Sequence, residues 1–113
     1  MISISDINLY TVTDSANTQE NTDILLRSML SGLKSEFWIE RIVSNGYSSP
    51  DNFWYDQDFN EWCLLVEGNA DLLLETQEII SLTKGDSYLF PAHCKHRVDK
   101  VSVDAIWLTV CWK

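Results

Sequence analysis

The stretch WYDQDFNEWCLLVEG, residues 54–68, contains the strongest strand signal in the 113-residue chain. It begins with aromatic and amide side chains, passes an acidic bend at residues 58–60, and reaches Glu61 just before the apolar run of residues 62–66. The run ends at Gly68-Asn69, a dipeptide typical of a hairpin turn. A short apolar run bounded by turn residues predicts a strand that is buried on both faces of a double-layered β structure.

Similar short segments, separated by turn residues, continue on both sides of this stretch. Alternation and β-forming residues predict strands over residues 37–44, 53–57, 61–67, 70–75, 78–82, 87–90, 96–102 and 105–112. Strands that recur at a spacing of about eight residues indicate a sandwich or a barrel. We therefore expect an all-β fold. A chain of this length forms one domain, here residues 1–113 with the barrel in 36–113.

The first 35 residues have a different pattern. Ile2–Tyr10 alternates weakly and is compatible with an edge strand, and residues 11–22 are polar and resemble a surface linker. After Thr22 or Asp23, either of which can cap a helix, apolar side chains follow at helical spacing (Leu26, Met29, Leu30 and Leu33). This pattern predicts a short N-terminal helix that lies on the sheet.

Composition restricts the classes of function. The chain has 17 acidic and 8 basic residues and a net charge of −9, which disfavours binding to nucleic acid or to anionic membrane surfaces. No apolar run reaches the length of about 18 residues that a membrane helix needs, and the acidic N-terminus does not resemble a signal peptide. The three cysteines form no CxxC pair, which favours a reducing compartment. We therefore expect a cytoplasmic protein.

Two segments contain the polar residues that could form a site. Tyr55 and Gln57 are two residues apart, so they project from the same face of an extended strand, and Glu61 follows across the acidic bend. In the second segment, a Gly and a Pro precede His96. If these segments face each other across a barrel, Tyr55, Gln57, Glu61 and His96 converge on one cavity.

The same residues resemble the two motifs of the cupin superfamily, over roughly residues 37–112. The first motif of that family is G-x5-H-x-H-x3,4-E-x6-G, and Glu61 and Gly68 match its acid and its last glycine. The second motif is G-x5-P-x-G-x2-H-x3-N, and Gly85, Pro91 and His96 match its opening glycine, its proline and its histidine at the family spacing. The resemblance implies a cupin-like double-stranded β-helix, which is a jelly-roll barrel.

The sequence also departs from both motifs. Tyr55 and Gln57 stand where the first motif has its two histidines, and Ser49 stands where that motif has its opening glycine. In the second motif, His93 replaces the glycine after proline and Lys100 replaces the final asparagine. The family's intact set of three histidines and one glutamate holds a divalent metal, and here only Glu61 and His96 are unaltered.

Three interpretations of the site remain open. In the first, Gln57, Glu61 and His96, with Tyr55 or His93 as a further ligand, hold a divalent ion such as Zn, Mn, Fe or Ni, although a neutral amide and a protonated phenol are weak donors. In the second, no metal is bound, and Glu61 and His96 form an acid–base pair or bind a small polar ligand. In the third, the site is vestigial and Glu61 is a satisfied buried carboxylate.

The aromatic residues and the family resemblance complete the expectations about function. Trp54 and Tyr55 adjoin the proposed ligand positions, so we expect them to contact a bound ligand or cofactor. The resemblance implies either an enzyme of the dioxygenase, isomerase or lyase type, with Glu61 or His96 as catalytic residues, or a non-catalytic binding or sensing module that has lost the metal. It also implies a small-molecule ligand and a homodimer.

Overall fold

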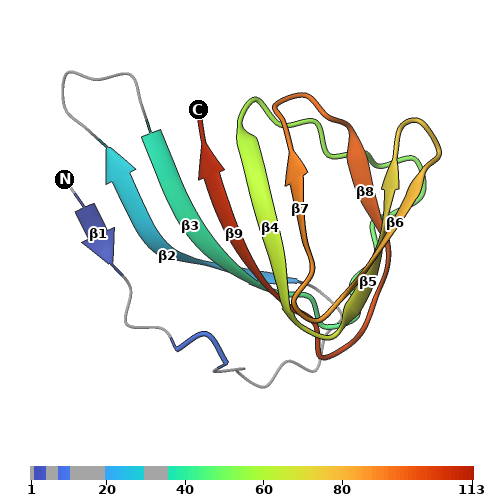
Figure 1. Cartoon of the computed structure of the whole chain (residues 1–113), viewed down its shortest axis with the longest axis horizontal. Helices are drawn as coiled ribbons and strands as arrows, with labels where there is room; N and C mark the ends of the chain where they lie inside the picture. The colour runs from blue at the N-terminus through green and yellow to red at the C-terminus, as the bar shows by residue number, and fades with distance from the viewer. Residues whose placement is uncertain (1, 5–7, 11–19, 30–35) are drawn as a thin grey trace.

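A computed structural model describes residues 2–4, 8–10, 20–29 and 36–113, and these residues form strands, turns and loops without any helix (Figure 1). Nine strands follow one another along the chain: β1 (Ile2–Ile4), β2 (Asn21–Met29), β3 (Glu36–Val43), β4 (Asn60–Glu67), β5 (Asn69–Leu74), β6 (Ile79–Thr83), β7 (Ser87–Phe90), β8 (His96–Val101) and β9 (Ile106–Trp112).

The strands form two antiparallel sheets. The larger sheet has the order β1-β2-β3-β9-β4-β7, and the smaller one has the order β6-β5-β8. Figure 1 shows β1 and β2 at one end of the molecule and the three-stranded sheet at the other, beside β4 and β7. Because the turn at Gly68 carries the chain directly from β4 to β5, the two sheets are joined there and enclose a common interior.

The core lies between the sheets and follows the two-residue period of the strands. On β4 the inward side chains of Glu61, Cys63 and Leu65 are buried, whereas the intervening positions are only half-buried. The run of residues 62–66 is thus buried on one face and partly exposed on the other, so the prediction of burial on both faces is wrong. The core cluster also includes Leu72, Leu82, Phe90, Ala105 and Trp107.

The predicted N-terminal helix is wrong where the structure describes it, because residues 21–29 form strand β2. This strand pairs with β3 along its whole length, from Asn21 opposite Val43 to Met29 opposite Glu36. The register shifts between Ile24 and Leu26, which indicates a β-bulge. The bulge interrupts the alternation that a strand normally shows, and the remaining apolar spacing resembles that of a helix. Residues 30–35 of the predicted helix lie outside the described residues.

The other predicted strands are confirmed within a few residues, with one exception. Residues 53–57 form no strand and make a single bridge, between Tyr55 and His96. The predicted edge strand over residues 2–10 is confirmed for Ile2–Ile4, which pairs with β2, while residues 9–10 form a turn. The predicted linker lies largely outside the described residues, and its last two residues belong to β2.

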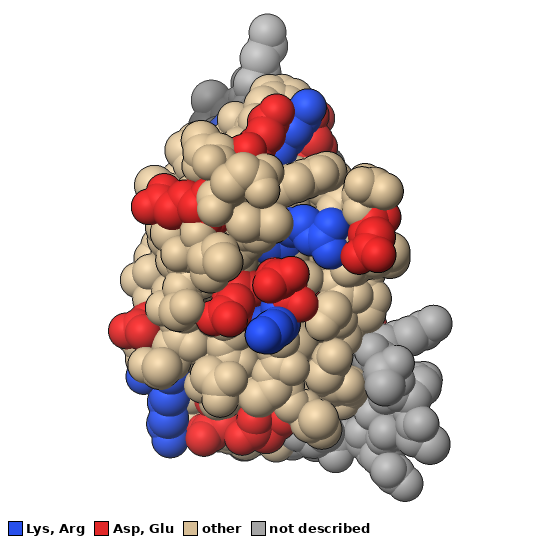
Figure 2. All heavy atoms as spheres, turned by 90° about the vertical axis from the view of Figure 1, so that its right-hand side faces the viewer, with Lys and Arg blue, Asp and Glu red and all other residues tan. Residues whose placement is uncertain are grey.

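Figure 2 faces the end of the molecule that holds the three-stranded sheet. Asp and Glu side chains are spread over this face, and Lys and Arg side chains lie singly or in small groups between them. The described part of this face therefore carries no continuous basic patch. Within residues 2–4, 8–10, 20–29 and 36–113, no helix is long and apolar enough to cross a membrane.

Candidate functional site

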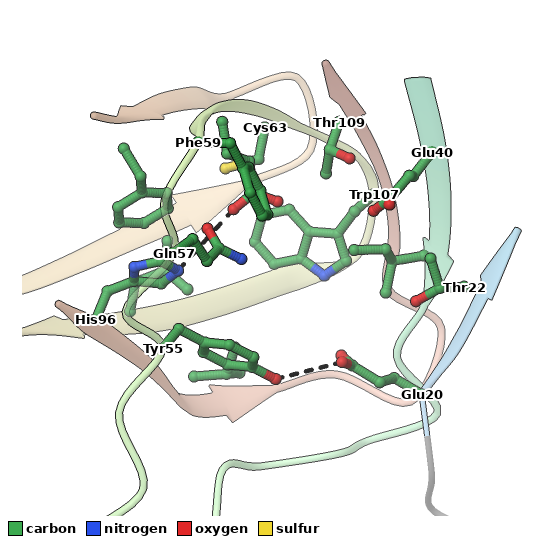
Figure 3. A pocket seen from close by; sticks show the side chains of 15 residues that line it. Glu20, Thr22, Glu40, Tyr55, Gln57, Phe59, Cys63, His96, Trp107 and Thr109 are labelled. Carbon is green, nitrogen blue, oxygen red and sulfur yellow. Dashed lines mark hydrogen bonds and ion pairs between the residues drawn. The ribbon is translucent and has the colours of Figure 1, made fainter. Parts of the chain in front are cut away.

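A cavity of about 300 Å³ lies between the two sheets, and residues of both sheets line it (Figure 3). Its walls combine aromatic and aliphatic side chains with carboxylates, hydroxyls, an amide and one imidazole. The lining residues are Glu20, Thr22, Glu40, Ile42, Tyr55, Gln57, Phe59, Glu61, Cys63, Leu72, Phe90, His96, Val98, Trp107 and Thr109. This mixture of apolar walls and a few polar groups is typical of small-molecule sites.

Glu61 reaches the cavity because it is the first inward position of β4. Its register partners are Cys111 on β9 and Phe90 on β7, both buried. Only 8% of Glu61 is exposed. Burial raises the pKa of this carboxyl group to about 7, and the negative charges of Glu40 and Glu20 add to the effect. Both protonation states of Glu61 are therefore populated near neutral pH.

His96, at the start of β8, is held between two aromatic rings. Its imidazole stacks on Phe90 with ring centroids 3.7 Å apart and on Tyr55 at 5.4 Å. Its Nδ1 lies 2.9 Å from the carbonyl oxygen of Cys94. A carbonyl only accepts hydrogen bonds, so we assign the proton to Nδ1, which leaves the Nε2 lone pair of the neutral ring free. Burial lowers the pKa of His96 and favours this neutral form.

Glu61 and His96 face each other inside the cavity. The distance from His96 Nε2 to Glu61 Oε1 is 4.0 Å, which is too long for a hydrogen bond, and both side chains are about nine-tenths buried. Among the described residues, none donates a hydrogen bond to the Glu61 carboxyl group or contacts His96 Nε2 within hydrogen-bond distance. Two buried polar groups thus keep unused hydrogen-bonding capacity toward the cavity.

Tyr55 and Gln57 also line the cavity, as predicted from their spacing, although they lie on a loop and not on a strand. Backbone hydrogen bonds fix this loop. Tyr55 and His96 exchange two of them, at 2.7 and 3.2 Å, and the amide of His93 donates to the carbonyl of Gln57 at 2.7 Å. Extended backbone at residues 55–57 therefore directs both side chains inward even without a full strand.

Glu20 and Glu40 are cavity residues that the sequence did not identify. Glu20 precedes β2 and accepts a hydrogen bond of 3.3 Å from the Tyr55 hydroxyl, and Glu40 on β3 accepts one of 3.0 Å from the indole N–H of Trp38. In Figure 3 both acids lie on the opposite side of the cavity from His96 and Gln57. The sequence contained a signal for Glu40, because a residue two positions from both Trp38 and Ile42 lies on the same strand face as these apolar side chains. Glu20 had none.

Two predicted site residues do not line the cavity. His93 is exposed and pairs with Asp56, with Nδ1 2.9 Å from Oδ1. Its φ angle is +64°, a left-handed conformation that explains why the family motif has glycine at this position. Trp54 lies under the Arg97 guanidinium, 6.0 Å from ring centroid to Cζ, and is also absent from the cavity wall.

The residues present do not fit the divalent metal of the family. Gln57, Glu61 and His96 share the cavity, but Tyr55 donates to Glu20 and burial raises its pKa, so its oxygen is a poor ligand. Throughout the described part of the chain, no three His, Cys, Asp or Glu side chains converge in a way that could hold a metal ion. Two strong donors and one neutral amide are too few for a tightly held ion.

Comparison with known proteins identifies the class of this fold. No protein-family model and no curated protein sequence matches the chain. Among solved structures, a Ralstonia eutropha protein provisionally named a mannose-6-phosphate isomerase is 33% identical, with a TM-score of 0.79 over 95% of this chain and 96% of that one. KdgF from a Halomonas species (15% identity, TM-score 0.67) covers 93% and 90% of the two chains.

An RmlC-like cupin from Shewanella frigidimarina is also similar in fold, with 18% identity and a TM-score of 0.60 over 87% of this chain and 79% of that one. These similarities and the two-sheet architecture establish the family. The chain belongs to the cupin superfamily.

Proposed function

We propose that this cupin binds a small polar molecule in its barrel and catalyses proton transfer on it, with Glu61 and His96 as the acid–base pair. The observation that carries the proposal is their geometry: two buried groups 4.0 Å apart across a cavity, each with a polar atom that no described residue satisfies. General acid–base catalysis needs groups whose pKa values lie near the working pH and which a substrate can reach.

The two residues are suited to opposite roles. His96, neutral and protonated on Nδ1, presents Nε2 as a base that can accept a proton from a substrate carbon or hydroxyl group. Glu61, whose pKa is raised to about 7, can donate its proton to a substrate oxygen in the same step. After this step His96 carries an extra proton and Glu61 lacks one. In an isomerisation the second half-reaction reverses both transfers, with His96 protonating the neighbouring carbon and Glu61 taking the hydroxyl proton. After an elimination, a proton must pass from His96 to Glu61, 4.0 Å away, to restore the pair.

Other residues of the cavity would bind and orient the substrate. Gln57 supplies an amide, and Thr22 and Thr109 supply hydroxyls. The His96 ring is stacked between Phe90 and Tyr55, which keeps it in one orientation. No step of the proposal passes through a metal, because the donor set does not fit one.

A non-catalytic binding or sensing module is the second candidate. The replacement of the first-motif histidines by Tyr55 and Gln57 favours it, because these residues keep the cavity lined but remove the family's metal ligands. A module of this kind would bind its ligand without any exchange of substrate protons.

Deuterium incorporation tests the proposal. Aldoses, ketoses, amino sugars and 2-oxo acids, with mannose 6-phosphate included because of the Ralstonia relative, are incubated with the protein in D2O containing a metal chelator. We expect exchange at a carbon next to the carbonyl of at least one compound. Exchange should fall by about 10²-fold or more in Glu61→Gln and in His96→Gln, which is the usual contribution of a general acid or base.

Matched controls separate a catalytic effect from a general one. His93→Asn keeps a residue that tolerates positive φ and lies outside the cavity, and Glu67→Gln removes a half-buried acid outside the cavity that pairs with Lys84. Both should exchange at the wild-type rate. Full exchange in Glu61→Gln or His96→Gln would refute the acid–base pair, and binding without any exchange would support the second candidate.

We also infer a homodimer and a cytoplasmic location. Small cupins commonly pair, and the three cysteines, Cys63, Cys94 and Cys111, are all free thiols. Light scattering of the purified protein would measure the mass against the monomer value of 13.0 kDa.

A further inference from the structure

The charged side chains that line the cavity in the described part of the chain are all acidic. Of the fifteen described residues that line it, three are glutamates and none is Lys or Arg. The walls also contain the aromatic side chains of Tyr55, Phe59, Phe90 and Trp107. Any ligand that enters must therefore be compatible with several carboxyl groups in a partly dehydrated, aromatic environment.

The three glutamates act on one another electrostatically. Glu20 and Glu40 both raise the pKa of Glu61, and Glu40 also raises that of Glu20, in each case after the larger effect of burial. Among the residues that the structure describes, no positive group lowers the pKa of Glu61 or Glu20. A positive charge in the cavity would be attracted by each ionised carboxylate and would favour ionisation of the others, whereas a phosphate or carboxylate would be repelled by each ionised carboxylate.

Glu61 provides an independent indication of a ligand. Its side chain is about nine-tenths buried, lines the cavity and receives no hydrogen bond from any described residue. Among the described residues, Arg97 Nε is the one fully buried side-chain polar atom without a partner, so the Glu61 oxygens are accessible from the cavity and a ligand can reach them. The unused Nε2 of His96, in the same wall, is a second polar atom that awaits a partner.

The size and layout of the site exclude a bare metal ion as the preferred occupant. The acids come from the start of β2, from β3 and from β4, and they do not converge on one point within the described residues. Glu20 and Glu40 lie across the cavity from His96 (Figure 3), and a space of about 300 Å³ is large enough for a small organic molecule. Aromatic faces add attraction for an organic cation.

We propose, on the basis of the function proposed above, that the ligand is a small organic cation such as a primary amine. Its charged group lies toward Glu20 and Glu40, its apolar part contacts Phe59 and Trp107, and its remaining polar atoms reach Glu61 and His96. The cavity thus selects against phosphorylated and carboxylated molecules, including the kind of substrate that the name of the Ralstonia relative implies.

Three ring compounds of the same size test the charge selectivity: cyclohexylamine, cyclohexanol and cyclohexanecarboxylate. Each is titrated into ¹⁵N-labelled protein at neutral pH and low salt, and the indole N–H signal of Trp107 reports binding inside the cavity. We expect the amine to bind at least tenfold more tightly than the alcohol, and the carboxylate not to bind. Mannose 6-phosphate, titrated in the same way, should not bind either.

Variants assign the selectivity to the cavity acids. Glu20→Gln and Glu61→Gln should each reduce the preference for the amine over the alcohol by at least threefold, whereas Glu75→Gln, at an exposed turn, should leave it unchanged. The alcohol serves as an internal control, because a variant that folds incorrectly loses binding of both compounds. Glu20→Gln, in the wall opposite His96, provides a second test if Glu61→Gln is unstable.

The outcomes distinguish this inference from the proposed function. Equal binding of amine and alcohol, binding of the carboxylate or of mannose 6-phosphate, or no binding of any probe would overturn the cationic ligand. None of these results bears on the acid–base pair, which depends on the exchange experiment. Conversely, an amine preference without any proton exchange would support the cationic ligand and leave a binding module in place of the enzyme.

Discussion

At the carboxyl group of Glu61, burial and like charge act in the same direction. Both favour the protonated form, so the folded protein binds this proton more tightly than the unfolded chain does. For a group whose folded pKa lies above its unfolded value of 4.5, the stabilising contribution is complete below pH 4.5 and is lost as the pH rises through about 7. Stability and proton binding are therefore linked at one residue.

We predict that this linkage is visible in unfolding. Between pH 4.5 and pH 8, Glu61 should reduce the free energy of unfolding by an amount on the order of 3 kcal/mol at most. Glu61→Gln cannot ionise, so the difference in stability between variant and wild type should shift in favour of the variant as the pH rises. Urea denaturation at pH 5 and pH 8 measures this difference.

His96 has the opposite effect on the pH dependence of the free energy of unfolding. The effect of Glu61 is therefore measured as the difference between wild type and Glu61→Gln. The pKa of His96 is lowered on folding, so its contribution is present above the unfolded value of 6.5 and is lost as the pH falls. The wild-type profile mixes both effects, while the difference between wild type and Glu61→Gln isolates the carboxyl group. A difference that is equal at pH 5 and pH 8 would contradict a raised pKa for Glu61.

At the scale of the elements, the turn between β4 and β5 fixes the position where the two sheets join. Gly68 has a φ angle of +87°, and a Cβ atom there would collide with Ser102 Oγ and lie 2.8 Å from Ala105 Cα. Gly85 has a similar φ of +93°, but no heavy atom lies within 4 Å of a Cβ built on it. The two motif glycines thus have similar left-handed backbone conformations, but only Gly68 lacks space for a side chain.

This pair makes a matched prediction. Gly85→Ala should lose about 1 kcal/mol of stability, since an alanine in a left-handed conformation is strained. Gly68→Ala has the same strain and also displaces the loop at residues 102–105, so it should lose about 2 kcal/mol more. Urea denaturation of both variants at one pH provides the comparison. Equal losses would show that the loop at 102–105 yields without cost.

Element by element, the sequence was most informative where the local pattern and the tertiary contacts agree. Strands β3 to β9 are short alternating or apolar segments bounded by turn residues, so their positions could be predicted. β2 could not, because the bulge between Ile24 and Leu26 breaks the period that identifies a strand. Residues 53–57 have strand-forming side chains, but Tyr55 alone among them pairs with β8. The extent of this pairing depends on the partner segment and cannot be read from residues 53–57 themselves.

The candidate site was predictable in part for a related reason. Tyr55, Gln57, Glu61 and His96 occupy positions of known motifs, and all four line the cavity. Glu20 and Tyr55, which are hydrogen-bonded, lie 35 residues apart in the sequence. The pairing of β2 with β3 brings them together, and a local sequence pattern cannot predict such a contact. The acidic character of the cavity therefore became visible only in three dimensions.

At the scale of the whole molecule, β9 is a central strand of the six-stranded sheet. It pairs with β3 on one side and with β4 on the other, and so joins the two halves of the six-stranded sheet. Trp107 on this strand also forms part of the cavity wall, where its indole N–H donates a hydrogen bond of 2.9 Å to Ser44. The sheet and the site both depend on β9.

We predict that a chain that ends at residue 104, and so lacks β9, does not fold. A chain that begins at residue 8 loses only β1, an edge strand that pairs with β2 alone, and should remain folded. Circular dichroism and thermal melting of the two truncated chains distinguish these results. A cooperative melting transition in the chain without β9 would contradict the central role of this strand.

The same arrangement has a consequence for biosynthesis. A ribosome completes β3 and β4 long before β9, so the two strands that β9 separates emerge without the partner that belongs between them. Pairing across such sequence distances is slow, and unpaired strand edges are prone to aggregate while they wait. The nascent chain should therefore stay unfolded until residue 112 has left the exit tunnel, and chaperones that shield extended segments should increase its yield.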